Sequence, residues 1–177
     1  AKILSTYGNA FMLRTDSDQK LEEFKKHMTI PIINGLSPSS HPTQVLSDVF
    51  TVEEIKKKPI SKLKICWIGD SNNVCNTWLQ AAELLDFNVH VSTPIGYEVE
   101  IERAGLLGND HFEEFKDPMD ATKGADIVTT DVWTSMGFEE EKKDRIRDFA
   151  DWQVNKDMMK LANKDAIFMH CLPAHRG

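Results

Sequence analysis

The sequence predicts an α/β fold, a Rossmann-like three-layer sandwich around a parallel sheet, preceded by the tail of a second α/β domain. Short apolar runs alternate with amphipathic segments along the 177 residues, as in successive βαβ units. Hydrophobic residues make up 41% of the chain, which is enough for a core. A charged stretch at 51–62, containing Pro59, separates two strand-helix series. We therefore predict two domain portions, residues 1–50 and 51–177.

Residues 1–50 are predicted to contain two strands and two helices. Apolar runs predict strands at 10–13 and 30–33. A helix is expected at 18–27 after the capping-type Asp16 or Ser17, and another at 42–50 with Pro42 in its first turn. Two strands are too few for a domain, so we expect the earlier part of this domain to lie outside the sequence.

Residues 51–177 are predicted to form a longer alternation of strands and helices. The strongest helix signal covers 73–85, where Cys75, Trp78, Leu79 and Ala82 recur at helical spacing. The sequence stops at Gly177, in an expected active-site loop, so we expect this domain to be incomplete at its C-terminus. The expected strands are 63–68, 89–92, 125–130, 153–154 and 166–170, and the other expected helices are 98–106, 144–151 and 157–162.

Composition argues against several classes of function. The chain has 21 basic and 28 acidic residues, a net charge of -7, and no basic stripe with interleaved aromatics, so no nucleic-acid partner is expected. No apolar stretch approaches the roughly 20 residues that cross a bilayer, so no membrane partner is expected either. The three cysteines include no CxxC pair, which disfavours a disulfide framework and a zinc ribbon and favours a reducing, cytoplasmic location.

Polar groups recur where the predicted strands end. Asp131 follows the strand at 125–130, and Cys171 follows the strand at 166–170. The carboxyl ends of parallel strands meet at one edge of a sheet, where α/β proteins bind their ligands. We therefore expect Asp131 and Cys171 to emerge side by side and to share one amine ligand.

Two more specific roles of Cys171, as a covalent nucleophile and as a zinc ligand, are disfavoured. A covalent Cys/His pair would need His170 against the thiol, but adjacent strand residues point to opposite faces of a sheet. A zinc ion prefers four ligands, and only His170, Cys171 and His175 cluster in the sequence. No metal is therefore expected.

Three further segments are candidate ligand sites, each with a structural alternative. His41 and Gln44 at a helix N-terminus can bind a carbonyl oxygen or an anion, or form only a capping turn. Asn72 and Asn73 open a helix without the glycines of a dinucleotide site, so they either grip a small molecule or cap the helix. Arg14, at a strand end, can bind a phosphate or carboxylate in bidentate fashion, or form a surface ion pair.

These motifs carry a family resemblance over essentially the whole chain. The segments 41–44 (His-Pro-Thr-Gln), 69–73, 131–137 and 170–173 (His-Cys-Leu-Pro) occur in the order and approximate spacing of ornithine carbamoyltransferases. The related aspartate carbamoyltransferases share the first element but differ in the last two. The sequence therefore resembles the ornithine branch of the aspartate/ornithine carbamoyltransferase family.

The resemblance implies transfer of a carbamoyl group from carbamoyl phosphate to the δ-amine of L-ornithine, giving L-citrulline and phosphate, in arginine metabolism. It implies no cofactor and, at full length, a homotrimer. Residues 1–50 would end the carbamoyl-phosphate-binding domain, and 51–177 would form the ornithine-binding domain. The bond between Leu172 and Pro173 would be cis. By motif, the catalytic residues would be Asp131, Cys171 and His41, carbamoyl phosphate would contact Arg14, His41 and Gln44, and ornithine would contact Asn73, Asp131, Ser135, Met136, Cys171 and Leu172.

Two departures from the family pattern bear on this expectation. The family's Ser-x-Arg-Thr-Arg phosphate loop and a C-terminal arginine are absent from the 177 residues, so we expect this segment alone to bind carbamoyl phosphate poorly and to be inactive. The segment 98–116 is shorter than expected. The alternative functions are a carbamoyltransferase for putrescine or an acylated ornithine, and a non-catalytic amino-acid-binding module.

Overall fold

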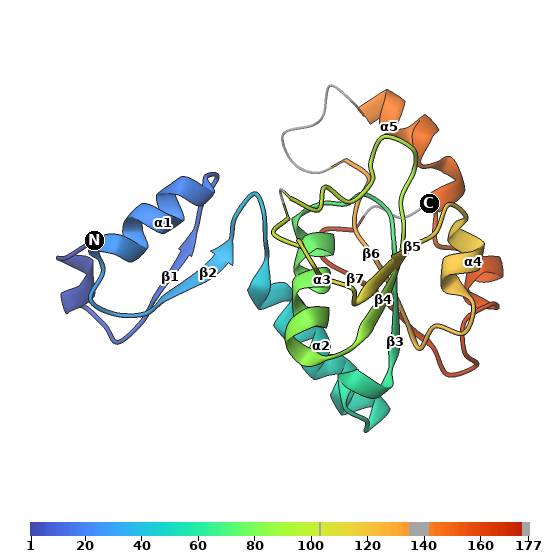
Figure 1. Cartoon of the computed structure of the whole chain (residues 1–177), viewed down its shortest axis with the longest axis horizontal. Coiled ribbons are helices and arrows are strands. Elements are labelled where there is room, and N and C mark those ends of the chain that lie inside the picture. The colour runs from blue at the N-terminus through green and yellow to red at the C-terminus, as the bar shows by residue number, and fades with distance from the viewer. Residues whose placement is uncertain (103, 135–141, 175–177) are drawn as a thin grey trace.

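The computed structural model describes residues 1–102, 104–134 and 142–174 and contains two parallel sheets within them (Figure 1). One sheet has two strands, and the other has five in the order β5-β4-β3-β6-β7. Every pair of neighbouring strands is parallel. The predicted α/β fold with a parallel sheet is therefore confirmed.

The two-stranded sheet pairs β1 (Phe11–Arg14) with β2 (Ile32–Leu36) and is crossed by α1 (Asp18–His27). The predicted bounds of α1 are confirmed, and Ser17 caps it by accepting a hydrogen bond from the Lys20 N–H. The Phe11 and Phe24 rings stack at 6.2 Å between centroids, which fastens α1 to β1. A short 3₁₀ turn, η1 (Leu4–Thr6), precedes this unit.

The five-stranded sheet is the middle of three layers. Side chains of β3 (Lys64–Ile68) alternate between its two faces. Ile65 and Trp67 join the core formed with α2 (Pro42–Lys56) and α3 (Asn73–Leu85), whereas Cys66 and Ile68 join the core on the opposite face. The second core includes α4 (Pro118–Thr122) and α6 (Lys156–Met159). Because both faces are covered, β3 is a continuous apolar run.

The remaining strands place their carboxyl ends at one edge of this sheet, and short elements complete the fold. The strands are β4 (Asn88–Ser92), β5 (Phe112–Glu114), β6 (Ile127–Thr130) and β7 (Ile167–His170). The other elements are η2 (Ile60–Lys62), α5 (Lys142–Asp148) and η4 (Ala150–Trp152). Within the described ranges, no helix has the length and apolar character needed to cross a bilayer.

The sequence prediction was wrong at two elements. The segment 153–154 is an extended connection and not a strand. The described residues of 98–106 form turns and not a helix, because Gly105 adopts a φ of 70° and Ala104 and Leu106 are buried by the turn. The strand β5 and the helix α4 were not predicted, since three and five residues are too few to display a periodic pattern.

Several boundaries also differ from the prediction. Helix α2 continues to Lys56 because Val52 extends the buried stripe of Val45 and Val49, and it ends where Lys57 adopts a left-handed conformation. Strand β2 starts two residues later than expected and runs to Leu36. The expected helices at 144–151 and 157–162 are the shorter α5 and α6.

Replacing Leu79 on α3 with alanine should lower the free energy of unfolding by about 3 kcal/mol, because the side chain is fully buried and leaves a cavity. Leu84 on the same helix is 82% exposed and provides the control. Urea denaturation of both variants tests the expectation. An equal loss in Leu84→Ala would show that the effect does not arise from the burial of Leu79.

Candidate active site

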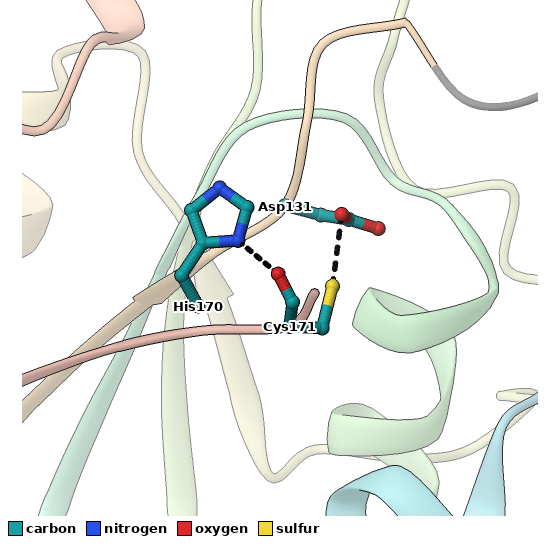
Figure 2. A group of neighbouring side chains, drawn as sticks. All are labelled: Asp131, His170 and Cys171. Atoms are coloured by element: carbon teal, nitrogen blue, oxygen red, sulfur yellow. Dashed lines mark hydrogen bonds between the residues drawn. The ribbon is translucent and has the colours of Figure 1, made fainter. Parts of the chain in front are cut away.

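Asp131 and Cys171 lie together because β6 and β7 are paired. Thr130 and His170, the last residues of these strands, are partners in the parallel register. The next residue of each chain segment therefore leaves the sheet at the same place. The Cys171 Sγ donates a hydrogen bond to Asp131 Oδ1 at 2.8 Å, as Figure 2 shows. The expected juxtaposition of thiol and carboxylate is confirmed.

Asn72 fixes the other side of the Asp131 carboxylate. Its Nδ2 donates to Asp131 Oδ2 at 2.7 Å, while its Oδ1 caps α3 by accepting from the N–H groups of Val74 and Cys75. The capping interpretation of Asn72 is therefore confirmed, and the same side chain also binds the Asp131 carboxylate. The Val132 N–H donates to Asp131 Oδ1 at 2.7 Å. The carboxylate is thus held by three donors in one orientation.

The Cys171 thiol is a hydrogen-bond donor at neutral pH. Burial raises its pKa well above the usual range, and the charge and hydrogen bond of Asp131 raise it further. A thiol of raised pKa is a poor nucleophile. The Nδ1 of the nearby His170 donates to the Cys171 carbonyl oxygen at 2.5 Å, so this ring nitrogen does not serve as a base for the thiol.

Asp131, His170 and Cys171 also form a group that resembles part of a metal site. One ligand atom from each lies within 4.8 Å of the others, and all three residue types bind zinc. The expected separation of His170 and Cys171 on opposite faces does not hold, because β7 ends at His170 and Cys171 is already outside the strand. The fourth candidate, His175, lies outside the described residues.

His41 is held where α2 meets α3. Its backbone N–H donates to Thr77 Oγ1 at 2.8 Å, and its Nδ1 lies 3.3 Å from Thr43 Oγ1. Burial lowers the pKa of His41, Arg14 lowers it further, and Asp131 opposes the change. A neutral imidazole with one N–H therefore lies within electrostatic reach of Arg14, at the exposed end of β1, and of Asp131.

The other predicted site residues make separate contacts and do not form one cluster in the structure. Asn73 Nδ2 donates to the Ser37 carbonyl oxygen at 3.0 Å, so this side chain links the exit of β2 to α3. Gln44 Nε2 donates to Asp48 Oδ1 at 3.0 Å, one turn along α2. Leu172 is exposed and precedes Pro173 through a cis peptide bond, as the resemblance implied. Ser135 and Met136 lie outside the described residues.

Two functional candidates, Asp48 and Arg145, were not singled out from the sequence. Asp48 was detectable, because it follows His41 and Gln44 at helical spacing on one side of α2. Arg145 was not, because its partner is 75 positions away: its Nη1 donates to Asp70 Oδ2 at 2.6 Å and to the Trp133 carbonyl oxygen at 3.0 Å. This cation ties the turn after β6 to the turn after β3.

A hollow on the described part of the molecule lies away from the candidate site. It has a volume of about 580 Å³ and is lined by residues at the amino ends of β3, β4 and β5, including Lys64, His90 and Glu113. Asp131 and Cys171 lie at the carboxyl ends of the sheet. The hollow is therefore on the opposite edge from the candidate site.

The sequence matches two family descriptions. Residues 61–177 match the Asp/Orn binding domain of aspartate/ornithine carbamoyltransferase, and residues 1–54 match its carbamoyl-P binding domain. The ornithine carbamoyltransferase of Methylobacillus flagellatus is 61% identical over all 177 residues, which cover 58% of that protein. The chain thus spans a little over half the length of the curated relatives it matches.

The fold is also similar to solved structures of ornithine carbamoyltransferases. The crystal structure of ornithine carbamoyltransferase from Burkholderia thailandensis superposes with a TM-score of 0.88 at 43% identity, covering 99% of this chain and 56% of the other. The ornithine carbamoyltransferase from Pyrococcus furiosus superposes with a TM-score of 0.87 at 44% identity, covering 99% and 57%. Nearly the whole described fold is shared with these proteins.

Replacing Asp131 with asparagine should make Cys171 more reactive, because the carboxylate charge that raises the thiol pKa is removed. Each unit by which the pKa falls increases the thiolate fraction roughly tenfold. Iodoacetamide labelling between pH 7 and 9, followed by peptide mass spectrometry, would measure the rate at Cys171 separately from those at the buried Cys66 and Cys75. Asp120→Asn, at an exposed carboxylate on α4, is the control. Equal Cys171 rates in both variants would contradict this assignment.

Replacing Asp70 with asparagine should lower the free energy of unfolding by about 3 kcal/mol, because it removes the carboxylate charge from a largely buried ion pair with the Arg145 guanidinium. The two side chains are only 17% and 10% exposed. Asp157→Asn breaks the largely exposed pair with Lys160 and should leave the unfolding midpoint unchanged. A matching loss of stability in both variants would contradict a special role for the Asp70–Arg145 pair.

Proposed function

The chain belongs to the aspartate/ornithine carbamoyltransferase family, and on that premise we propose that the protein containing it transfers the carbamoyl group of carbamoyl phosphate to the δ-amine of L-ornithine. The products are L-citrulline and phosphate. The observation that carries the proposal is the Asp131–Cys171 pair, whose atoms converge at 2.8 Å at the carboxyl edge of the sheet. A small amine would be bound at this edge.

Asp131 and Cys171 would act on the amine of ornithine. The δ-ammonium is not a nucleophile until it loses a proton, and its positive charge complements the oriented Asp131 carboxylate. An amine N–H can replace the thiol proton at Asp131 Oδ1, while the Cys171 thiol and the Leu172 carbonyl remain as neighbouring polar groups. Asn72 holds the carboxylate in place during this exchange.

Arg14, His41 and Gln44 would bind carbamoyl phosphate. The free amine attacks the carbamoyl carbon, the bond from that carbon to the phosphate oxygen breaks, and the departing phosphate takes up the second amine proton. Negative charge develops on the carbonyl oxygen during attack, and donors preorganised around that oxygen lower the barrier. The Arg14 guanidinium and the neutral His41 imidazole are such donors, and they influence each other electrostatically.

The arrangement of the whole protein is part of the same proposal. Residues 1–50 would complete a carbamoyl-phosphate-binding domain and 51–177 would form most of an ornithine-binding domain, in which Asn73, Ser135 and Met136 contact the amino acid. Helix α2, which carries His41 and Gln44 and packs on α3, crosses this boundary. A cytoplasmic homotrimer would be the working form, and the three free cysteines suit a reducing compartment.

Phosphate release from carbamoyl phosphate by the full-length protein, with L-ornithine, putrescine and N-acetylornithine compared as amines, tests this function. Asp131→Asn should lower kcat/KM for ornithine by about 10²-fold or more, because the amine loses the charged group that binds and orients it. The exposed Asp110→Asn is the control. Preference for another amine, or an unchanged kcat/KM in Asp131→Asn, would refute the proposal.

A further inference from the structure

Asp48 is a half-buried carboxylate on α2, beside the candidate site. It follows His41 and Gln44 along one side of α2 and accepts the 3.0 Å hydrogen bond from Gln44 Nε2. Its charge also reaches the Cys171 thiol, where it contributes to the raised pKa. Asp48 therefore lies behind Gln44, on the side of the helix that faces the carboxyl edge of the sheet.

The Asp48–Gln44 pair differs from an ordinary pair on a helix surface. Gln19 and Glu23 on α1 have the same spacing, but they are exposed and 3.5 Å apart. Burial raises the pKa of Asp48 to about 6, against the lowering effect of the Gln44 hydrogen bond. Burying a carboxylate is unfavourable, so a carboxylate kept behind a predicted ligand-binding amide suggests a functional reason.

An ionised carboxylate fixes the orientation of a carboxamide. It only accepts hydrogen bonds, so it selects the Nε2 end of Gln44 and turns the Oε1 end away. The oxygen left for a ligand is a pure acceptor. A carbamoyl group carries an amino group that donates to such an acceptor, whereas an acetyl group carries a methyl group in the same place.

We infer that Asp48 is a positioning residue that holds the Gln44 carboxamide with Oε1 toward the carbamoyl amino group, and that it thereby makes the site select a carbamoyl phosphate over an acyl phosphate. The inference rests on the proposed function and identifies its selectivity determinant. Sites built to bind a substrate N–H reject analogues that lack it, because a buried polar group is left unpaired. Asp48 acts through Gln44 and does not touch the substrate.

The test compares carbamoyl phosphate with acetyl phosphate in the full-length Asp48→Asn protein. Asparagine has nearly the same shape but can donate as well as accept, so the Gln44 amide is free to rotate. The KM for carbamoyl phosphate should rise about tenfold, the upper end expected for one neutral hydrogen bond, while the Ki of acetyl phosphate as a competitive inhibitor changes less than about twofold. Glu23→Gln, in the matched exposed pair, should change neither constant. A parallel rise of both constants in Asp48→Asn, or no rise in either, would overturn the inference.

A double-mutant cycle separates positioning from general structural damage. In a Gln44→Ala background, Asp48→Asn should cause no further loss of selectivity, because the group through which Asp48 acts is gone. An additional loss equal to that of the single variant would show that Asp48 acts independently of Gln44.

The wild-type protein gives a second measurement that does not depend on a variant folding. Asp48 is ionised above its pKa of about 6, so the ratio of the carbamoyl phosphate KM to the acetyl phosphate Ki should be constant above pH 7 and rise as the pH falls through 6. Cys171 faces Asp48 from the end of β7 and stays protonated in this range. Burial lowers the pKa of His41 from its ordinary value, and the His41 contact with the carbonyl oxygen is common to both compounds. A flat ratio would count against the inference.

The two proposals fail in distinguishable ways. A full-length wild-type protein that forms no citrulline would refute the proposed function and this inference with it. If the wild-type protein forms citrulline but Asp48→Asn has the same selectivity for carbamoyl phosphate over acetyl phosphate as the wild type, only the role of Asp48 is refuted.

Discussion

The parallel register between β6 and β7 is the constraint on which the candidate site depends. Thr130 lies opposite His170, so Asp131 and Cys171 leave the sheet as neighbours although they are 40 positions apart. All four residues of β6 are buried. A slip of one residue would turn its side chains to the wrong faces, so the packing that builds the core also fixes the distance between thiol and carboxylate.

Groups around this pair serve the fold and the site at once. Asn72 caps α3 with its oxygen and holds Asp131 with its nitrogen. Arg145 neutralises Asp70 and also binds the Trp133 carbonyl, so one buried cation joins the turns after β3 and β6. The proposed role of Asp48 behind Gln44 follows the same logic, in which a second group sets the orientation of the one that meets the ligand.

Sequence reasoning failed where local pattern and tertiary packing disagree. The segment 98–106 was predicted to be a helix, but Gly105 adopts a positive φ, and Val99, Ala104 and Leu106 are buried without helical structure. Strand β5 has only three residues and exists because β4 offers an open edge. His170 and Cys171 were expected to diverge, but the strand ends between them, so the alternation of faces no longer applies.

The sequence by itself determined the α/β class, the helices with strong periodicity or caps, and the residues at the ends of β6 and β7, because these depend on local spacing and on the rule that parallel strands end at one edge. Only the tertiary structure decided which donor holds which oxygen of Asp131, that the Asn73 amide is engaged by Ser37, and that Arg145 pairs with Asp70. Such pairings join residues tens of positions apart, and their geometry is set by how layers pack, which no local pattern encodes.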